Sequence, residues 1–137
     1  MTEAGTPFAH FEVDVAAIVE LDHHAIGRRR MVPLTGGVIS GQIGDGVVLP
    51  GGTDWQWVDV SGRIVLDAHY TIELGTGDRV EVESNGIRVA EADGTVYFRS
   101  AIRLTGPAHR TDINNRLYNA RGTRLENTVV LDLFPVD

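Results

Sequence analysis

The sequence predicts an all-β protein that folds as a single antiparallel up-and-down β-barrel, calycin-like, of about eight to ten strands. Short runs of alternating polar and apolar residues follow one another along the chain, and this period of two is typical of strands with one buried face. Sixteen glycines punctuate the runs. The connections are only two to six residues long, which favours antiparallel neighbours over strands bridged by helices. Closure into a barrel would remove exposed sheet edges.

The individual elements follow from turn chemistry. Ser61-Gly62 and Asp93-Gly94 read as hairpin turns, and Asn85-Gly86 reads as a third. Residues 21–27 read as a turn or short irregular segment, and Gly106-Pro107 marks a loop. The expected strands are residues 11–15, 38–41, 46–49, 55–60, 63–73, 79–83, 87–91, 96–104, 115–119 and 129–134.

Length and composition restrict the class of protein. The 137 residues predict one domain, residues 1–137, with a flexible N-terminal segment over residues 1–7. The net charge of −7 opposes binding to nucleic acid. There is no cysteine, and no apolar run approaches the roughly 20 residues of a transmembrane helix. We expect a cytoplasmic protein with neither nucleic acid nor membrane as a partner.

Polar side chains predict a ligand pocket. The stretch from Gly46 to Trp57 places an acidic residue, an amide and two tryptophans after a glycine-proline turn. Strand alternation directs Asp54 and Gln56 away from the tryptophans. Two later strands each carry a polar face as well. If the middle of the barrel is polar, six side chains converge on a small molecule: Asp54, Gln56, Asp67, His69, Tyr97 and Arg99.

Each of these residues also has a structural interpretation. The polar faces can point to solvent, since strands of a barrel normally have one wet side. Asp54 can serve a turn by accepting hydrogen bonds from backbone amides. Arg99 can pair with Asp67 as a structural ion pair, and Trp55 and Trp57 can be packing residues. Three consecutive arginines, from Arg28 to Arg30, contact an anionic ligand or neutralise nearby carboxylates.

Metal and cofactor motifs are missing from the sequence. His23 and His24 are adjacent and the remaining three histidines are isolated, which is not the spacing of metal ligands. The chain has no nucleophile elbow, phosphate-binding loop or dinucleotide fingerprint. We therefore expect no metal site and no cofactor.

Several blocks resemble the family called domain of unknown function 3237, a family of uncharacterised small β-barrel proteins. They are Gly27-Arg28-Arg29, Pro33 with Gly36-Gly37, Leu49 to Trp55, Asp67-Ala68-His69-Tyr70 and Tyr97-Phe98-Arg99. The resemblance spans about residues 8–136 and implies a single antiparallel barrel; its motif residues are Arg28, Asp54, Trp55, Asp67, Tyr70 and Arg99. Residues 111–115 depart from the family's usual Tyr-x-Trp-Leu-Asn, although Asn115 keeps the amide.

Three functions remain open at this stage. The first is a cofactor-free acid–base enzyme, of isomerase, cyclase or hydratase type, acting on a small aromatic or polyketide-like carbonyl compound. Asp54 or Asp67 would be its base and Arg99 would stabilise negative charge. The expected ligand-binding residues are Arg28, Trp55, Gln56, His69, Tyr70, Tyr97 and Asn115. The second is a binding protein for an apolar metabolite, and the third is a subunit of a homo-oligomer.

Overall fold

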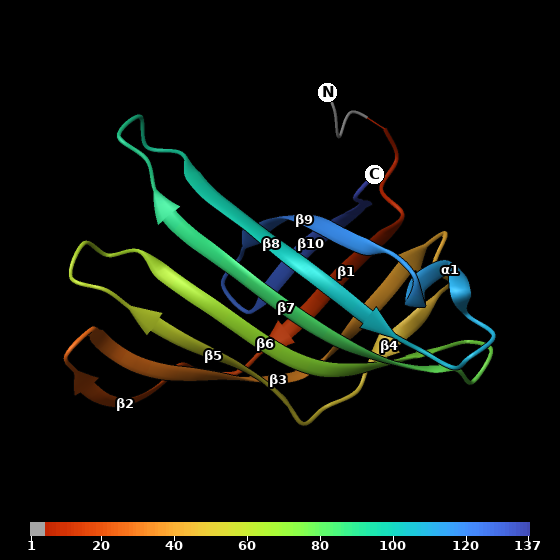
Figure 1. Ribbon diagram of the computed structural model, residues 1–137. Helices are drawn as coiled ribbons and strands as arrows, with labels where there is room; N and C mark the ends of the chain where they lie inside the picture. The colour runs from red at the N-terminus through yellow and green to blue at the C-terminus, as the bar shows by residue number, and fades with distance from the viewer. Residues whose placement is uncertain (1–4) are drawn as a thin grey trace.

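The computed structural model describes residues 5–137 and shows a closed antiparallel barrel (Figure 1). The expectation of a flexible segment at residues 1–7 falls in part on residues 1–4, which lie outside the described residues. The elements are β1 (Ala9–Val15), β2 (Val19–His24), β3 (Gly27–Gly41), β4 (Gly46–Val48), β5 (Gly52–Val58), β6 (Ile64–Leu74), β7 (Arg79–Ala90), β8 (Val96–Thr105), α1 (Thr111–Asn114), β9 (Leu117–Arg124) and β10 (Thr128–Pro135).

Eight strands close the barrel and two are additional. Antiparallel pairing runs from β1 through β10, β9, β8, β7 and β6 to β5 and β3, and β3 pairs again with β1. β4 fills the gap between the second half of β3 and β6. Among the strands of residues 5–137, β2 pairs with β3 alone, and all six of its residues are exposed. The predicted fold class is confirmed.

The expected strand boundaries needed four corrections. Residues 79–90 form one strand, so the predicted turn at Asn85-Gly86 is wrong. A Cβ on Gly86 would lie 2.5 Å from the carbonyl oxygen of Arg99 on β8. The glycine therefore allows the two strands to approach closely. Residues 21–27 are not a turn throughout, because β2 occupies 19–24. β3 begins at Gly27, far before the expected residue 38, and β9 begins at Leu117 and continues to Arg124.

One end of the barrel is closed by α1 and filled with apolar side chains. Ile113 of α1 is fully buried and belongs to the hydrophobic core. The largest fully buried side chains, all from the strand ends nearest α1, are Phe11, Ile72, Val80, Val82, Ile102, Leu104, Tyr118 and Leu133. No helix among residues 5–137 is long and apolar enough to cross a membrane.

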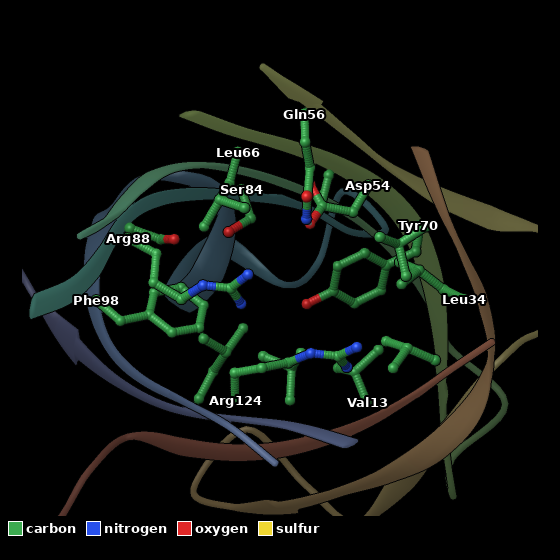
Figure 2. A pocket seen from close by; sticks show the side chains of 16 residues that line it. Val13, Leu34, Asp54, Gln56, Leu66, Tyr70, Ser84, Arg88, Phe98 and Arg124 are labelled. Atoms are coloured by element: carbon green, nitrogen blue, oxygen red, sulfur yellow. The ribbon is translucent and has the colours of Figure 1, made fainter. Parts of the chain in front are cut away.

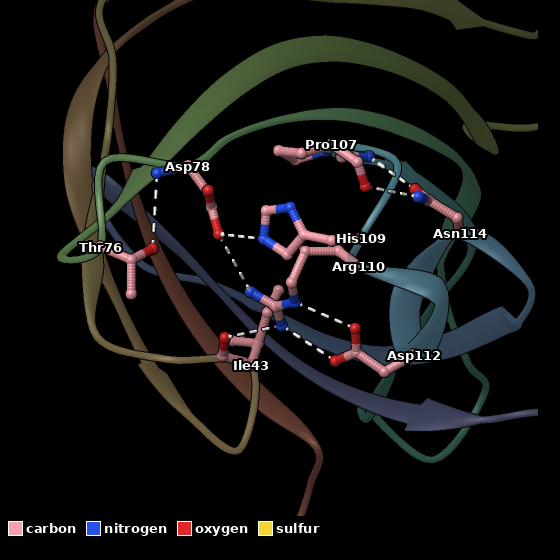
Figure 3. Close-up of polar contacts among 9 residues, drawn as sticks. Ile43, Thr76, Asp78, Pro107, His109, Arg110, Asp112 and Asn114 are labelled. Carbon is pink, nitrogen blue, oxygen red and sulfur yellow. Dashed lines mark hydrogen bonds and ion pairs between the residues drawn. The ribbon is translucent and has the colours of Figure 1, made fainter.

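Hydrogen bonds hold α1 in place although it is only four residues long (Figure 3). Asn114 accepts a bond from the Gly106 amide at 2.7 Å and donates to the Pro107 carbonyl at 2.8 Å. Arg110 donates to both carboxylate oxygens of Asp112 at 2.9 Å and to the Ile43 carbonyl at 3.1 Å. These bonds tie the helix to two loops at the closed end of the barrel.

Candidate functional site

A cavity occupies the half of the barrel away from α1 (Figure 2). The space open to the centre of a water molecule is about 50 Å³. Most of its walls are apolar, which follows from the inward-facing alternation of the strands. Its polar and charged lining residues are Asp54, Gln56, Tyr70, Ser84, Arg88, Ser100 and Arg124, from five different strands.

Asp54 ends a line of hydrogen bonds along the inner wall. Arg30 Nε donates to Gln56 Oε1 at 2.7 Å, and Gln56 Nε2 donates to Asp54 Oδ2 at 2.7 Å. The backbone amide of Asp67 donates to Asp54 Oδ1 at 3.2 Å. Burial raises the pKa of Asp54 above its ordinary value, although the hydrogen bond from Gln56 opposes this shift. The carboxyl group is therefore a stronger base than an exposed aspartate, in a fixed orientation.

Two buried polar atoms of the cavity have no hydrogen-bond partner. Within residues 5–137, the buried side-chain atoms in this condition are Tyr70 Oη and Arg124 Nη1. Figure 2 shows the Tyr70 hydroxyl pointing into the middle of the cavity. Burial raises the pKa of Tyr70, so its hydroxyl stays protonated and can donate a hydrogen bond. Unpaired buried polar atoms are rare, and here both face the same space.

The open half of the barrel is positively charged inside. Arg30, Arg88 and Arg124 lie on β3, β7 and β9, and none of the ion pairs found among the described residues includes them. Burial lowers the pKa of Arg88, and the neighbouring charges of Arg124 and Arg30 lower it further. Asp54 is the one carboxylate among the lining residues. The interior thus has the opposite sign to the protein as a whole.

A cleft of about 510 Å³ opens at this end of the barrel. Arg88, Phe98 and Arg124 line both this cleft and the inner cavity, so they form the neck between the two. The Arg88 guanidinium lies 5.7 Å from the centre of the Phe98 ring. The remaining walls of the cleft are small or aliphatic: Gly62, Ile64, Val89, Ala90, Val96, Gly122 and Thr123.

Of the residues predicted from the sequence, Asp54, Gln56 and Tyr70 meet in this cavity. The predicted convergence is wrong for Asp67, His69, Tyr97 and Arg99, which lie on the outer face. Asp67 is paired with His69 at 2.9 Å, with about half of each side chain exposed. Arg99 lies 5.1 Å from the Tyr97 ring, and its guanidinium bonds to the Phe98 carbonyl.

The register of β5 and β6 explains the outward position of Asp67. Trp55 pairs with Asp67, and Asp54 pairs with Ala68. A two-residue turn at Ser61-Gly62 would instead have paired Gln56 with Asp67, on the inner face. The loop has three residues, with Gly62 at a φ of 91° and Asp59 bonded to Arg63 across it. One residue of register reverses which face each side chain occupies.

The other predicted residues also lie outside the cavity. The Arg29 guanidinium lies 4.6 Å from the ring centre of Trp57 and 5.3 Å from that of Trp55, on the outer face. Arg28 is 3.8 Å from Glu20 of β2. Asn115 follows α1 at the closed end. The predicted ion pair between Arg99 and Asp67 is not among the contacts of the described residues.

Sequence reasoning missed four interior polar residues, Ser84, Arg88, Ser100 and Arg124, and considered Arg30 only within the run of three arginines. The signal that could have found them is alternation with buried neighbours, since Ser84 lies two residues after Val82 and Ser100 lies two residues after Phe98.

Among residues 5–137, no group of three or more histidine and acidic side chains is placed to hold a metal ion.

Comparison with known proteins places the chain in a family. The model of the family "Protein of unknown function (DUF3237)" matches residues 4–136. A UPF0311 protein of Clostridium acetobutylicum is 44% identical over 126 residues, which cover 81% of this chain and 79% of that protein.

Solved structures show the same fold. A beta-barrel like protein from Acinetobacter baumannii superimposes with a TM-score of 0.91 at 26% identity, covering 96% of this chain and 94% of the other. An enzyme from Penicillium herquei has a TM-score of 0.66 at 20% identity, covering 98% and 99% of the two chains, and this likeness concerns the fold alone. The chain belongs to the DUF3237 family, also described as UPF0311, of uncharacterised β-barrel proteins.

Proposed function

We propose that this protein is an enzyme that performs cofactor-free acid–base chemistry on a small carbonyl compound inside the barrel. The observation that carries the proposal is the pairing, in one cavity, of a carboxyl group of raised pKa with a buried hydroxyl that has no partner. Perturbed titratable groups in an enclosed cavity are typical of active sites. The likeness to an enzyme from Penicillium herquei is consistent with a barrel that can carry catalysis, but it identifies no chemistry.

In the proposed mechanism, Asp54 removes a proton from a carbon next to the carbonyl group. Each of its oxygens accepts one hydrogen bond within the protein, which leaves lone pairs for the substrate. The electron pair of the broken C–H bond moves to the carbonyl oxygen and forms an enolate. Asp54 then returns the proton to another position, which completes an isomerisation. Cyclisation and hydration would use the carboxylate of Asp54 and the hydroxyl of Tyr70 on other substrates.

Tyr70 stabilises the enolate in this scheme. Its hydroxyl donates a hydrogen bond to the developing oxyanion, with the guanidinium groups of Arg88 and Arg124 close by in the same cavity. Gln56 acts as a positioning residue, because Arg30 fixes its amide and the amide fixes Asp54. Donors already in place need no reorganisation as the charge forms.

Solvent deuterium exchange tests the proposal without knowledge of the product. The protein is incubated in D₂O with a panel of enolisable carbonyl compounds, and loss of the α-proton signals is followed by ¹H NMR. We expect exchange by the wild type and a loss of about 10²-fold or more in Asp54→Asn, because a general base contributes about that factor. The rate should rise with pH through an inflection above the ordinary aspartate pKa of 3.8, since ionised Asp54 is the active form.

Asp67→Asn is the matched control, as it changes the same residue type on the outer face of the adjacent strand. It should exchange protons at the wild-type rate. If Asp54→Asn were fully active, or Asp67→Asn equally impaired, Asp54 would not be the base. A wild type that binds members of the panel without any exchange would indicate the alternative function, a binding protein.

A further inference from the structure

The charges that line the cavity do not balance. Arg88 and Arg124 contribute two positive charges, and Asp54 contributes one negative charge when ionised. The third interior arginine, Arg30, is not among the residues that line the cavity, and its Nε donates a hydrogen bond to Gln56. The lining therefore has an excess of one positive charge in a protein whose net charge is −7.

A buried cation without a counter-ion is costly, and proteins usually provide a partner for it. Arg124 Nη1 is buried without any hydrogen-bond partner, and no ion pair among the described residues includes Arg88 or Arg124. Arginine presents a planar fork that matches a carboxylate with two parallel hydrogen bonds. A ligand group of one negative charge would neutralise the lining.

From this imbalance we infer that the substrate carries a carboxylate group, bound at the neck of the cavity by Arg88 and Arg124. This inference rests on the proposed function for the reacting end of the molecule. With its carboxylate at the neck, the carbonyl end reaches inward to Tyr70 and Asp54. The substrate class is then a short oxocarboxylate, and any apolar substituent occupies the cleft outside the neck, whose walls are small and aliphatic.

Phe98 lies at the neck together with the two arginines. A Cβ on Gly122 of β9 would lie 2.7 Å from the Phe98 ring, so the glycine allows the ring to lie against the backbone of β9. Arg88 lies over this ring from β7, and Figure 2 shows the guanidinium groups of Arg88 and Arg124 both directed into the cavity. Both arginines are therefore specificity-determining residues.

Matched pairs of ligands test the inference. The probes are oxocarboxylates of three to six carbons, such as pyruvate, acetoacetate and levulinate, each compared with its primary amide. Affinities are measured by calorimetry with both the wild type and Asp54→Asn, because the variant removes the proposed base but also removes the one negative charge of the lining. We expect at least one acid to bind tenfold or more tightly than its amide. In Asp54→Asn proteins that also carry Arg88→Gln or Arg124→Gln, this preference should disappear.

Arg99→Gln in the same background is the control, since Arg99 is next to Phe98 in sequence but lies on the outer face. It should keep the full preference for the acid. Inorganic phosphate is a further probe, and tighter binding of phosphate than of every acid would overturn the inference. Equal binding of acids and amides would overturn it too, as would no binding of any acid at 10 mM.

The melting temperature of the ligand-free variants guards against a purely structural loss. Arg124→Gln removes a half-buried charged group whose Nη1 has no hydrogen-bond partner among the described residues, so its melting temperature should equal or exceed that of the wild type. A marked decrease would mean that the arginine supports the fold, and would overturn its assignment to the ligand. The two proposals fail on different results. A preference for acids without deuterium exchange would refute the proposed enzymatic function. Exchange confined to neutral carbonyl compounds would refute the inference that the substrate carries a carboxylate.

Discussion

The unpartnered hydroxyl of Tyr70 gives a sharp prediction for Tyr70→Phe. Tyr70 is 5% exposed, and its ring packs edge-on against Phe11 with ring centres 6.5 Å apart. Phenylalanine keeps this packing and removes only the oxygen. A buried polar group without a partner costs about 1–3 kcal/mol, so its removal should stabilise the ligand-free protein.

Water in the cavity reduces the expected gain. The open space of about 50 Å³ exceeds the roughly 10–15 Å³ that one water molecule needs, and a bound water can accept the tyrosine hydrogen bond. We therefore expect Tyr70→Phe to raise the free energy of unfolding by about 0 to 2 kcal/mol. For a domain of this size, 1 kcal/mol corresponds to roughly 4 °C in melting temperature.

Tyr118→Phe is the matched control within the same barrel. Tyr118 is 1% exposed, and its hydroxyl donates to the Asp112 carbonyl at 3.2 Å. Its replacement removes a hydrogen bond and should lower the free energy of unfolding by about 0.5–1.5 kcal/mol. Both variants are measured by urea denaturation with a check that the slope is unchanged. A loss of more than about 1 kcal/mol in Tyr70→Phe would show that its hydroxyl is paired within the protein, and would remove it from the ligand site.

Two further predictions concern the barrel wall. His10 lies between Asp132 at 2.7 Å and Glu12 at 3.0 Å, and the hydrogen bond to Asp132 raises its pKa above 6.5. The stability that protonated His10 contributes is present below pH 6.5 and is lost as pH rises through the folded-state pKa. The melting temperature of His10→Gln should therefore change less than that of the wild type between about pH 6 and pH 8. An unchanged pH dependence of the melting temperature would contradict this. Gly122→Ala should cost about 1–3 kcal/mol in urea denaturation because its Cβ would overlap the Phe98 ring. Gly75→Ala, whose nearest contact would be 3.5 Å away, should cost much less, and equal losses would refute the packing argument.

The fold could be predicted from the sequence because apolar alternation is a property of each strand by itself. Residues 63–73 place Leu66, Tyr70 and Ile72 on one face, and the structure buries that face. Short connections then leave little choice but antiparallel neighbours. β2 escaped prediction because its alternation is short: only Val19 and Leu21 are apolar, and both are exposed in the structure.

The site was harder to predict because it depends on how strands pair. Asp54 and Gln56, like Asp67 and His69, were placed inside by allowing a polar face to point inward, and Tyr70 came from the family resemblance. The loop after Val58 is one residue longer than a two-residue turn, and this single residue decides that Ala68, not His69, lies opposite Asp54. Loop length of this kind is not visible in the alternation of either strand.

The missed arginines show how one wrongly predicted turn misplaces a residue that lines the cavity. Val80, Val82, Ser84 and Arg88 share a face if residues 79–90 are one strand, and that face is the inner one. A turn at Asn85-Gly86 would interrupt the alternation of side chains, so Arg88 could not be assigned to the inner face from the position of Val82. Arg124 was lost in the same way, because the expected strand ended at Asn119 and the inner face of β9 continues through Gly122. Glycine in a strand marks both a turn and a close approach between neighbours, and only the pairing across β8 distinguishes the two. The positive charge of the cavity is therefore a property of strand continuity, and no local motif encodes it.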